Sequence, residues 1–110
     1  MSIIEIADKS DFLNEKMKYF KLDNGKEILI INYEGSYYAV DARCTHMKGD
    51  LSKGSLEGKI LTCPRHGSKF DITTGVAIQG PKIGFLKLST RDLGIYKIET
   101  EGDKLKIDIG

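Results

Sequence analysis

The amino-acid sequence predicts an all-β protein, a meander or barrel of short antiparallel strands. Apolar and polar residues alternate over segments of six or seven residues, and turn-forming residues separate these segments. A long apolar stripe with the 3.6-residue period of a helix is missing. The strands that this pattern indicates are residues 17–22, 27–33, 36–41, 95–100 and 104–109.

The connections between these strands have the composition of short hairpin turns. Asn24-Gly25 is a strong hairpin signal, because both residues tolerate a positive φ. Glu34-Gly35 forms the next turn, and residues 101–103 form the last. The best helix candidate is the short segment from Asp8 to Glu15, which Asp8 or Ser10 could cap.

The middle of the chain has a different character. Residues of about 42–82 read as a loop-rich insertion around two short strands, at 58–62 and 68–72. Beyond it, residues 83–89 are expected to add a strand or a lid. We therefore expect one domain over residues 1–110, with a site placed on loops at one end of the strands.

Composition excludes several classes of function. The chain has 110 residues and a net charge of +1, which favours neither nucleic acid nor a membrane as partner. The N-terminus lacks the basic and apolar regions of a secretory signal, which predicts a cytoplasmic protein, and we expect a monomer. In that reducing compartment a lone cysteine pair is more often a metal or redox site than a disulfide.

All the cysteines and histidines of the chain lie close together. Cys44-Thr45-His46 is followed, after sixteen residues, by Cys63-Pro64-Arg65-His66. Each segment supplies one thiolate and one imidazole, and turn residues follow both segments. Two such loops facing each other would present four ligands to a metal centre.

Three interpretations of this pattern compete. The first is incidental cysteines or a Cys44–Cys63 disulfide, although two Cys-His pairs in loops are not a core-packing pattern. The second is a Cys2His2 zinc site, but structural zinc usually groups Cys with Cys and His with His. The third is a [2Fe-2S] cluster with two cysteines on one iron and two histidines on the other, and the pattern favours it.

The two segments resemble the Rieske motif, and specifically that of small Rieske-type ferredoxins. The resemblance extends to residues 38–43 before the first segment, to Asp71-Ile72-Thr73-Thr74-Gly75 after the second, and to the closing hairpin. It implies a Rieske-like fold in which Cys44 and Cys63 bind one iron and His46 and His66 the other. It further implies that Gly80-Pro81 supplies a proline-containing loop over the cluster, so that Pro81 belongs to the site.

Ser68 has two interpretations. The resemblance places it where a serine hydroxyl hydrogen-bonds a bridging sulfide in some relatives. Its position beside Gly67 also suits an ordinary turn residue. Respiratory Rieske proteins carry an additional cysteine in each loop, and this chain has none to spare, which places it on the ferredoxin side of the family.

The expected function is that of a soluble one-electron carrier between a reductase and an acceptor such as an oxygenase. The chain itself is not an enzyme, because both histidines are used by the cluster and none is left for a mononuclear catalytic iron. The alternatives are a small subunit of a larger redox enzyme, such as a nitrite reductase, or the zinc module. We expect redox partners to dock near His46 and His66, where basic residues gather: Arg43, Lys48, Lys53, Arg65, Lys69 and Lys82.

Overall fold

The computed structural model describes residues 3–45, 49–65, 67–80, 82–83, 86–87 and 90–109. The predicted all-β class is confirmed, and every strand pair is antiparallel. The elements are β1 (Ile3–Asp8), the 3-10 helix η1 (Lys9–Phe12), β2 (Met17–Lys21), β3 (Glu27–Tyr33), β4 (Ser36–Asp41), the 3-10 helix η2 (Leu51–Lys53), β5 (Ser55–Glu57), β6 (Ile60–Thr62), β7 (Lys69–Asp71), β8 (Ala77–Gln79), β9 (Lys82–Ile83), β10 (Leu86–Lys87), β11 (Ile95–Tyr96), β12 (Ile98–Glu101) and β13 (Lys104–Asp108). The described residues contain no helix that is long and apolar enough to cross a bilayer.

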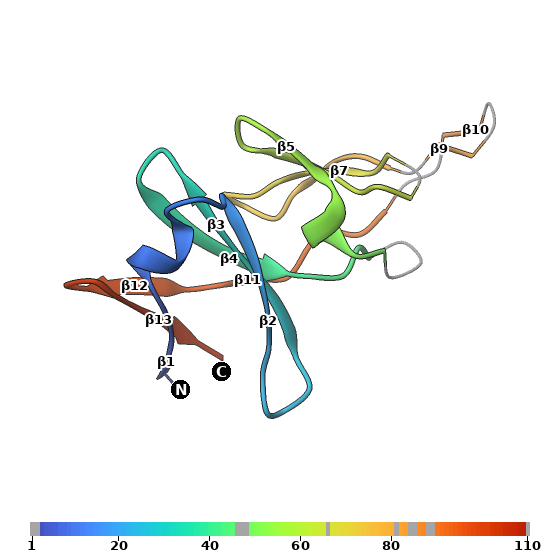
Figure 1. The fold of residues 1–110 in the computed structure, drawn as a ribbon. Coiled ribbons are helices and arrows are strands. Elements are labelled where there is room, and N and C mark those ends of the chain that lie inside the picture. Colours follow the sequence, from blue (N-terminus) through green and yellow to red (C-terminus); the bar gives the residue numbers. More distant parts are fainter. Residues whose placement is uncertain are drawn as a thin grey trace.

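The strands form a central sheet with a second sheet on each side of it. The central sheet has the order β11-β4-β3-β2, and the terminal strands form the sheet β1-β13-β12. The insertion forms a four-stranded sheet, β5-β6-β7-β8, and β9 pairs with β10. Figure 1 shows both chain ends on the side of the terminal sheet, and the β9–β10 pair at the opposite end of the molecule.

Strand β3 is buried on both faces, because a separate core lies on each side of the central sheet. Ile28 and Ile30 belong to one core, together with Leu105 and Ile107 of β13. Its continuous apolar run in the sequence is typical of a strand buried on both faces.

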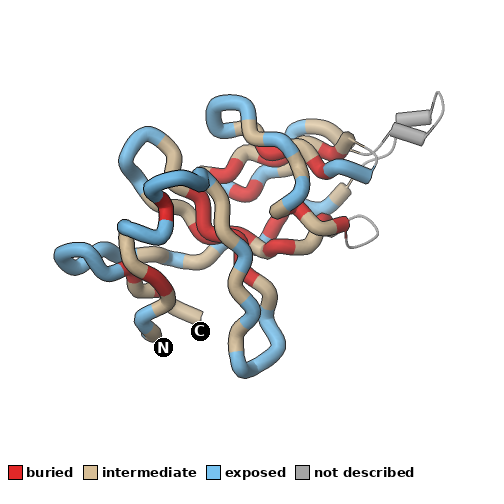
Figure 2. Tube along the Cα trace, in the orientation of Figure 1, coloured by how far each residue is buried: buried red, intermediate tan, exposed pale blue. Residues whose placement is uncertain are grey.

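Leu29 and Ile31 of β3 belong to the other core, which lies toward the insertion. This core also contains Leu61 and Phe70 of the insertion sheet. Figure 2 shows the buried segments running along the middle of the strands, with the hairpin tips exposed.

The hairpin turns at Asn24-Gly25 and Glu34-Gly35 differ from each other in length and in backbone geometry. The loop at Asn24-Gly25 has three residues, closed by a 2.8 Å bond from the Leu22 N–H to the Lys26 carbonyl. The predicted hairpin is present, and of its two turn residues only Gly25 adopts a positive φ, of 89°. The reason is that a three-residue hairpin loop needs one left-handed residue, after a type I turn. The two-residue turn with positive φ at both positions is Glu34-Gly35, at 52° and 83°.

Two predicted elements are shorter than expected. The helix candidate is a single 3-10 turn with Asp8 as its N-cap, and the Asp8 N–H donates to Asp11 Oδ2 at 2.9 Å. A single turn is enough to place the one residue that this segment buries, Phe12. The strand predicted at 95–100 is split, since Ile95–Tyr96 pair with β4 while Ile98–Glu101 pair with β13. The chain therefore changes sheets at Lys97.

The insertion has more strand than the sequence indicated. The predicted strands at 58–62 and 68–72 are present as β6 and β7, and β5 and β8 flank them. Residues 82–83 and 86–87 form a further short hairpin, as expected for an added strand near 83–89. The loops at Cys44 and Cys63 are thus held by a sheet of their own.

Asp41 joins the returning chain to the central sheet. The Tyr96 hydroxyl donates to Asp41 Oδ1 at 2.5 Å, and the Gly94 N–H donates to Asp41 Oδ2 at 3.1 Å. Burial, and then the hydrogen bond to Asp41, raise the pKa of Tyr96 above its ordinary value. The neutral phenol is therefore the form that the folded state stabilises.

We expect Tyr96→Phe to lower the free energy of unfolding by about 1 kcal/mol, since it removes one partly buried hydrogen bond to a carboxylate. Urea unfolding at pH 7 should show a lower midpoint with an unchanged m-value. Because the folded-state pKa is raised, the difference from wild type should be full below pH ~10 and shrink as the pH rises further.

Tyr37→Phe is the matched control for this substitution. Its ring packs edge-on against Phe12 at 5.4 Å, and its hydroxyl has no hydrogen bond within the described part of the chain. Equal midpoints for Tyr96→Phe and Tyr37→Phe would show that the Tyr96–Asp41 bond contributes nothing to stability.

Candidate metal centre

The first cysteine opens a loop that the backbone closes tightly. The Cys44 N–H donates to the Gly49 carbonyl at 2.8 Å, and Arg43 and Asp50 form an antiparallel bridge just outside it. The loop leaves the end of β4 and leads into η2, whose N-cap is Asp50. His46, expected as a ligand in this loop, lies outside the described residues.

The second cysteine opens a loop with the same closing bond. The Cys63 N–H donates to the Ser68 carbonyl at 2.8 Å, and the Gly67 N–H donates back to the Cys63 carbonyl at 3.2 Å. As in the first loop, the cysteine bonds the carbonyl five residues further on. This loop connects β6 with β7, and His66 within it lies outside the described residues.

The two loops lie against each other at Gly49. A Cβ on Gly49 would lie 2.8 Å from the Cys63 sulfur and 3.1 Å from both Cγ and Cδ of Arg65. The backbone of the first loop therefore approaches the thiol of the second more closely than any side chain would allow. The facing arrangement expected from the sequence is present at this contact.

Both cysteine side chains are buried, each only 2% exposed, and they are not joined as a disulfide. They belong to the core that contains Leu61 and Phe70. This excludes the disulfide considered from the sequence. Sulfur ligands in a dry, mostly apolar setting suit a thiophilic metal such as iron in a cluster.

Ser68 is a buried polar residue next to the second cysteine loop. Its side chain is 1% exposed, and Oγ has no hydrogen-bond partner among the described residues. A buried hydroxyl without a partner costs about 1–3 kcal/mol, so such groups are rare in folded proteins. Burial argues against a solvated turn residue, and the hydroxyl proton remains available to a sulfide of a bound cluster.

The remaining side of the loops is approached by the chain after β8. Gln79 Nε2 donates to the Gly67 carbonyl at 3.3 Å, and Gly80 follows directly. Pro81, expected to cover the cluster, lies outside the described residues. In the described part of the chain, which lacks both histidines, no three metal-binding side chains gather at one point.

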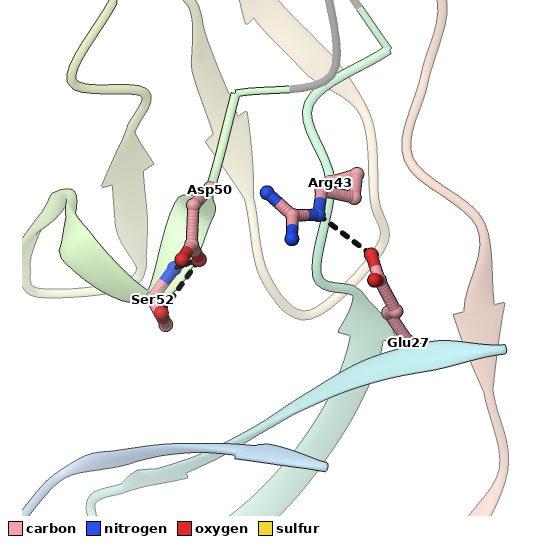
Figure 3. A network of polar contacts seen from close by, with 4 residues as sticks. All are labelled: Glu27, Arg43, Asp50 and Ser52. Atoms are coloured by element: carbon pink, nitrogen blue, oxygen red, sulfur yellow. Dashed lines mark hydrogen bonds and ion pairs between the residues drawn. The ribbon is translucent and has the colours of Figure 1, made fainter. Parts of the chain in front are cut away.

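An ion pair holds the stem of the first loop (Figure 3). Arg43 Nε lies 2.6 Å from Glu27 Oε2 of β3, and this bond is the main cause that lowers the pKa of Glu27. Burial alone would raise the pKa of Asp50, but its hydrogen bonds from Ser52 outweigh that effect and lower it. Arg43 was expected as part of a basic docking rim, whereas here its charge is paired.

Sequence reasoning missed several residues at this site. Glu27 lies sixteen positions before Arg43, and its spacing carries no signal of the contact. From the sequence, Gly49 was only one of the turn residues that follow the first segment. In the structure, its missing side chain leaves room for the Cys63 sulfur. Thr45 and Gln79 were not singled out, because their partners lie in distant parts of the chain.

Comparison with known proteins agrees with this geometry. The family model of the Rieske [2Fe-2S] domain matches residues 2–89. The ferredoxin component of a naphthalene 1,2-dioxygenase system from Pseudomonas putida is 35% identical over 106 residues, covering 96% of this chain and 94% of that protein. A component of the same description from Pseudomonas aeruginosa is 36% identical over 85 residues, covering 77% and 75%.

A solved structure shows the same fold. A chain in the complex of reduced oxygenase and oxidized ferredoxin in carbazole 1,9a-dioxygenase superposes with a TM-score of 0.82, at 23% identity, over 96% of this chain and all of that chain. At this identity the likeness establishes the fold and no more.

The fold and the two cysteine loops define a small iron–sulfur protein of the ferredoxin type. The chain belongs to the Rieske [2Fe-2S] domain family. Its cofactor is a [2Fe-2S] cluster, and it is an electron carrier that does not turn over a substrate of its own.

We expect Gly49→Ala to reduce cluster content sharply, because the added Cβ would displace the Cys63 sulfur or the Arg65 side chain. Iron and sulfide per chain and the visible absorption of the purified protein measure the effect. Gly58→Ala is the control: this glycine has a φ of 60° in the β5–β6 turn, with no atom within 4 Å of the added Cβ. Gly58→Ala should weaken folding while leaving the cluster content intact, and an equal loss of iron in both variants would contradict the prediction.

Proposed function

We propose that this chain is the ferredoxin of a multicomponent oxygenase, accepting single electrons from a reductase and passing them to the oxygenase component. The observation that carries the proposal is the pair of buried cysteines in facing loops with the same closing bond. The relatives named as ferredoxin components of dioxygenase systems support the choice of acceptor.

In this proposal Cys44 and Cys63 bind one iron, and His46 and His66 bind the other. The bound cluster supplies a centre that takes up and releases one electron at a time. Support comes from the buried thiols and from the buried Ser68 hydroxyl, which has no hydrogen-bond partner among the described residues. Pro81 is included because Gln79, two residues before it, is bonded to the second loop.

The proposal also concerns the organisation and location of the chain. Residues 1–110 are taken as one domain, with a cluster-binding part at about 42–82, because both cysteine loops and β5–β8 fall in that range. A cytoplasmic location is part of the same proposal, because iron-binding cysteines must remain reduced. The proposal also takes the chain to be a monomer.

Docking of the redox partners is proposed near His46 and His66. The acidic side chains around the loops are engaged within the protein: Asp50 by Ser52, and Asp71 by Thr73 and Lys59. Lys53 and Lys69 form no ion pair within the part of the chain that the structure describes. The amino groups of these two lysines remain available to an acidic partner.

The direct test is reconstitution with a reductase and an oxygenase of an aromatic-ring dioxygenase system. The wild-type protein should be coloured, contain iron and sulfide, and support product formation, whereas Cys63→Ala should do none of these. A colourless protein that contains zinc, or a coloured one that no reductase reduces, would contradict the proposal.

The midpoint potential provides a separate prediction. Rieske centres span about −150 to +300 mV, and hydrogen bonds to the sulfurs raise the value. With no bracing disulfide and Ser68 as the one buried hydroxyl without a partner beside the loops in the described residues, we expect the lower part of that range. Ser68→Ala should lower the midpoint further in a redox titration.

Ser52→Ala is the control for the potential, because its hydroxyl already donates to Asp50 at 2.6 Å. Its midpoint should equal that of wild type. Equal midpoints for Ser68→Ala and wild type would refute the role given to Ser68. A clearly positive wild-type midpoint would refute the prediction of a low potential.

The docking surface is tested by charge reversal. Lys53→Glu combined with Lys69→Glu should slow electron transfer to the partner about tenfold at low salt and flatten its salt dependence. Lys97→Glu, in the link between β11 and β12, is the control and should leave both unchanged. Equal salt dependence in the two proteins would place the docking surface elsewhere.

A further inference from the structure

The chain between β8 and β11 leaves and returns beside the two cysteine loops. It departs at Gln79, the last residue of β8, and passes through the short β9–β10 hairpin. It returns at Thr90 and Arg91 before joining β11. Figure 1 shows this excursion at the end of the molecule remote from the termini.

The departing limb is bonded to the second cysteine loop. Gln79 Nε2 donates to the Gly67 carbonyl at 3.3 Å, and Gly67 directly follows His66 in the sequence. The backbone of Gln79 is fixed by pairing with Lys69 of β7. The bond therefore connects the loop with a residue whose own position is set by a sheet.

The returning limb is bonded to the first cysteine loop through Thr45. The Thr45 hydroxyl donates to the Arg91 carbonyl at 2.7 Å. Because that bond uses its only proton, the 2.8 Å contact with the Thr90 hydroxyl must have Thr90 as the donor. Thr45 lies between Cys44 and His46 in the sequence. The two hydrogen bonds therefore hold the residue that separates two expected ligands.

The returning limb is itself held in place. Asp92 Oδ1 accepts from the Ala77 N–H at 2.8 Å, and the Leu93 N–H donates to the Gly75 carbonyl at 2.7 Å. Leu93 is buried in the same core as the two cysteines. The two limbs are thus tied to each other as well as to the loops, and Thr45 is anchored to a rigid segment.

We propose that Thr45 and Gln79 are positioning residues for the cluster, each fixing a loop at the residue next to an expected histidine ligand. The inference rests on the proposed cluster site and extends it, because neither side chain is itself a ligand. A loop held at its cysteine and again at this second point has less freedom to shift its backbone. Loss of either bond should loosen the geometry of the metal centre while the fold is retained.

Variants at Thr45 and Thr90 test the first anchor. Thr45→Val removes both bonds of the hydroxyl and keeps the shape of the side chain, and Thr45→Ser keeps the hydroxyl. Thr90→Val removes one bond and leaves the Thr45–Arg91 bond in place. Thr100→Val, on exposed β12 in the terminal sheet, is the matched control.

The readouts are the rate at which a chelator bleaches the purified protein, the line shape of the reduced EPR signal and the midpoint potential. Thr45→Val should bleach roughly two- to tenfold faster than wild type, the effect of one or two lost hydrogen bonds, with an altered EPR line shape. Thr45→Ser and Thr100→Val should match wild type. The double variant Thr45→Val/Thr90→Val should bleach no faster than Thr45→Val, because the Thr90 bond is already lost.

The second anchor is tested by Gln79→Met, which keeps length but has no donor, and it should also speed bleaching and change the line shape. Thermal unfolding of the cluster-free proteins is measured alongside. If Thr45→Val lowers that stability but leaves EPR and potential unchanged, the residue is merely structural and the inference is overturned. No readout involves a partner, so a chain that keeps its cluster but fails to serve an oxygenase would refute the proposed function alone.

Discussion

The burial of β3 on both faces is the constraint on which the rest of the structure depends. Residues Ile28 to Ile31 are all fully buried, and they alternate between two cores. Burying such a side chain is worth about 1.5–3 kcal/mol, and one strand contributes to both cores at once. The terminal sheet is held on one side, and the insertion with its cysteine loops on the other.

The first cysteine loop begins where this sheet ends, and its stem is bonded directly to β3. The Ala42 N–H donates to the Glu27 carbonyl at 3.0 Å, and the Glu27 carboxylate pairs with Arg43 (Figure 3). The register of β3 against β4 therefore sets where Cys44 lies. The β6–β7 hairpin does the same for Cys63, and the two thiols come to lie in one apolar core. If these sulfurs bind a metal as thiolates, the charge of the metal compensates theirs in this apolar setting.

Most strands and the two facing cysteine loops could be predicted from the sequence. Local alternation is enough to locate β3 and β4, because each pairs with its neighbour through a short hairpin. The hairpin at Asn24-Gly25 could be predicted but its geometry could not, because loop length, not composition, selects the turn type. The break at Lys97 could not be predicted, since it depends on which sheet each half of the segment joins.

By itself, the sequence determined the class of protein and the residues expected to hold the cluster. Ligand chemistry is a property of residue types and short spacings, so Cys44-Thr45-His46 and Cys63-Pro64-Arg65-His66 already indicate it. Only the tertiary structure decided that Gly49 faces the Cys63 sulfur, that Ser68 is buried with no hydrogen-bond partner among the described residues, and that Thr45 is anchored at Arg91. These contacts join residues far apart along the chain, and their distances follow from the packing of sheets, which no local pattern encodes.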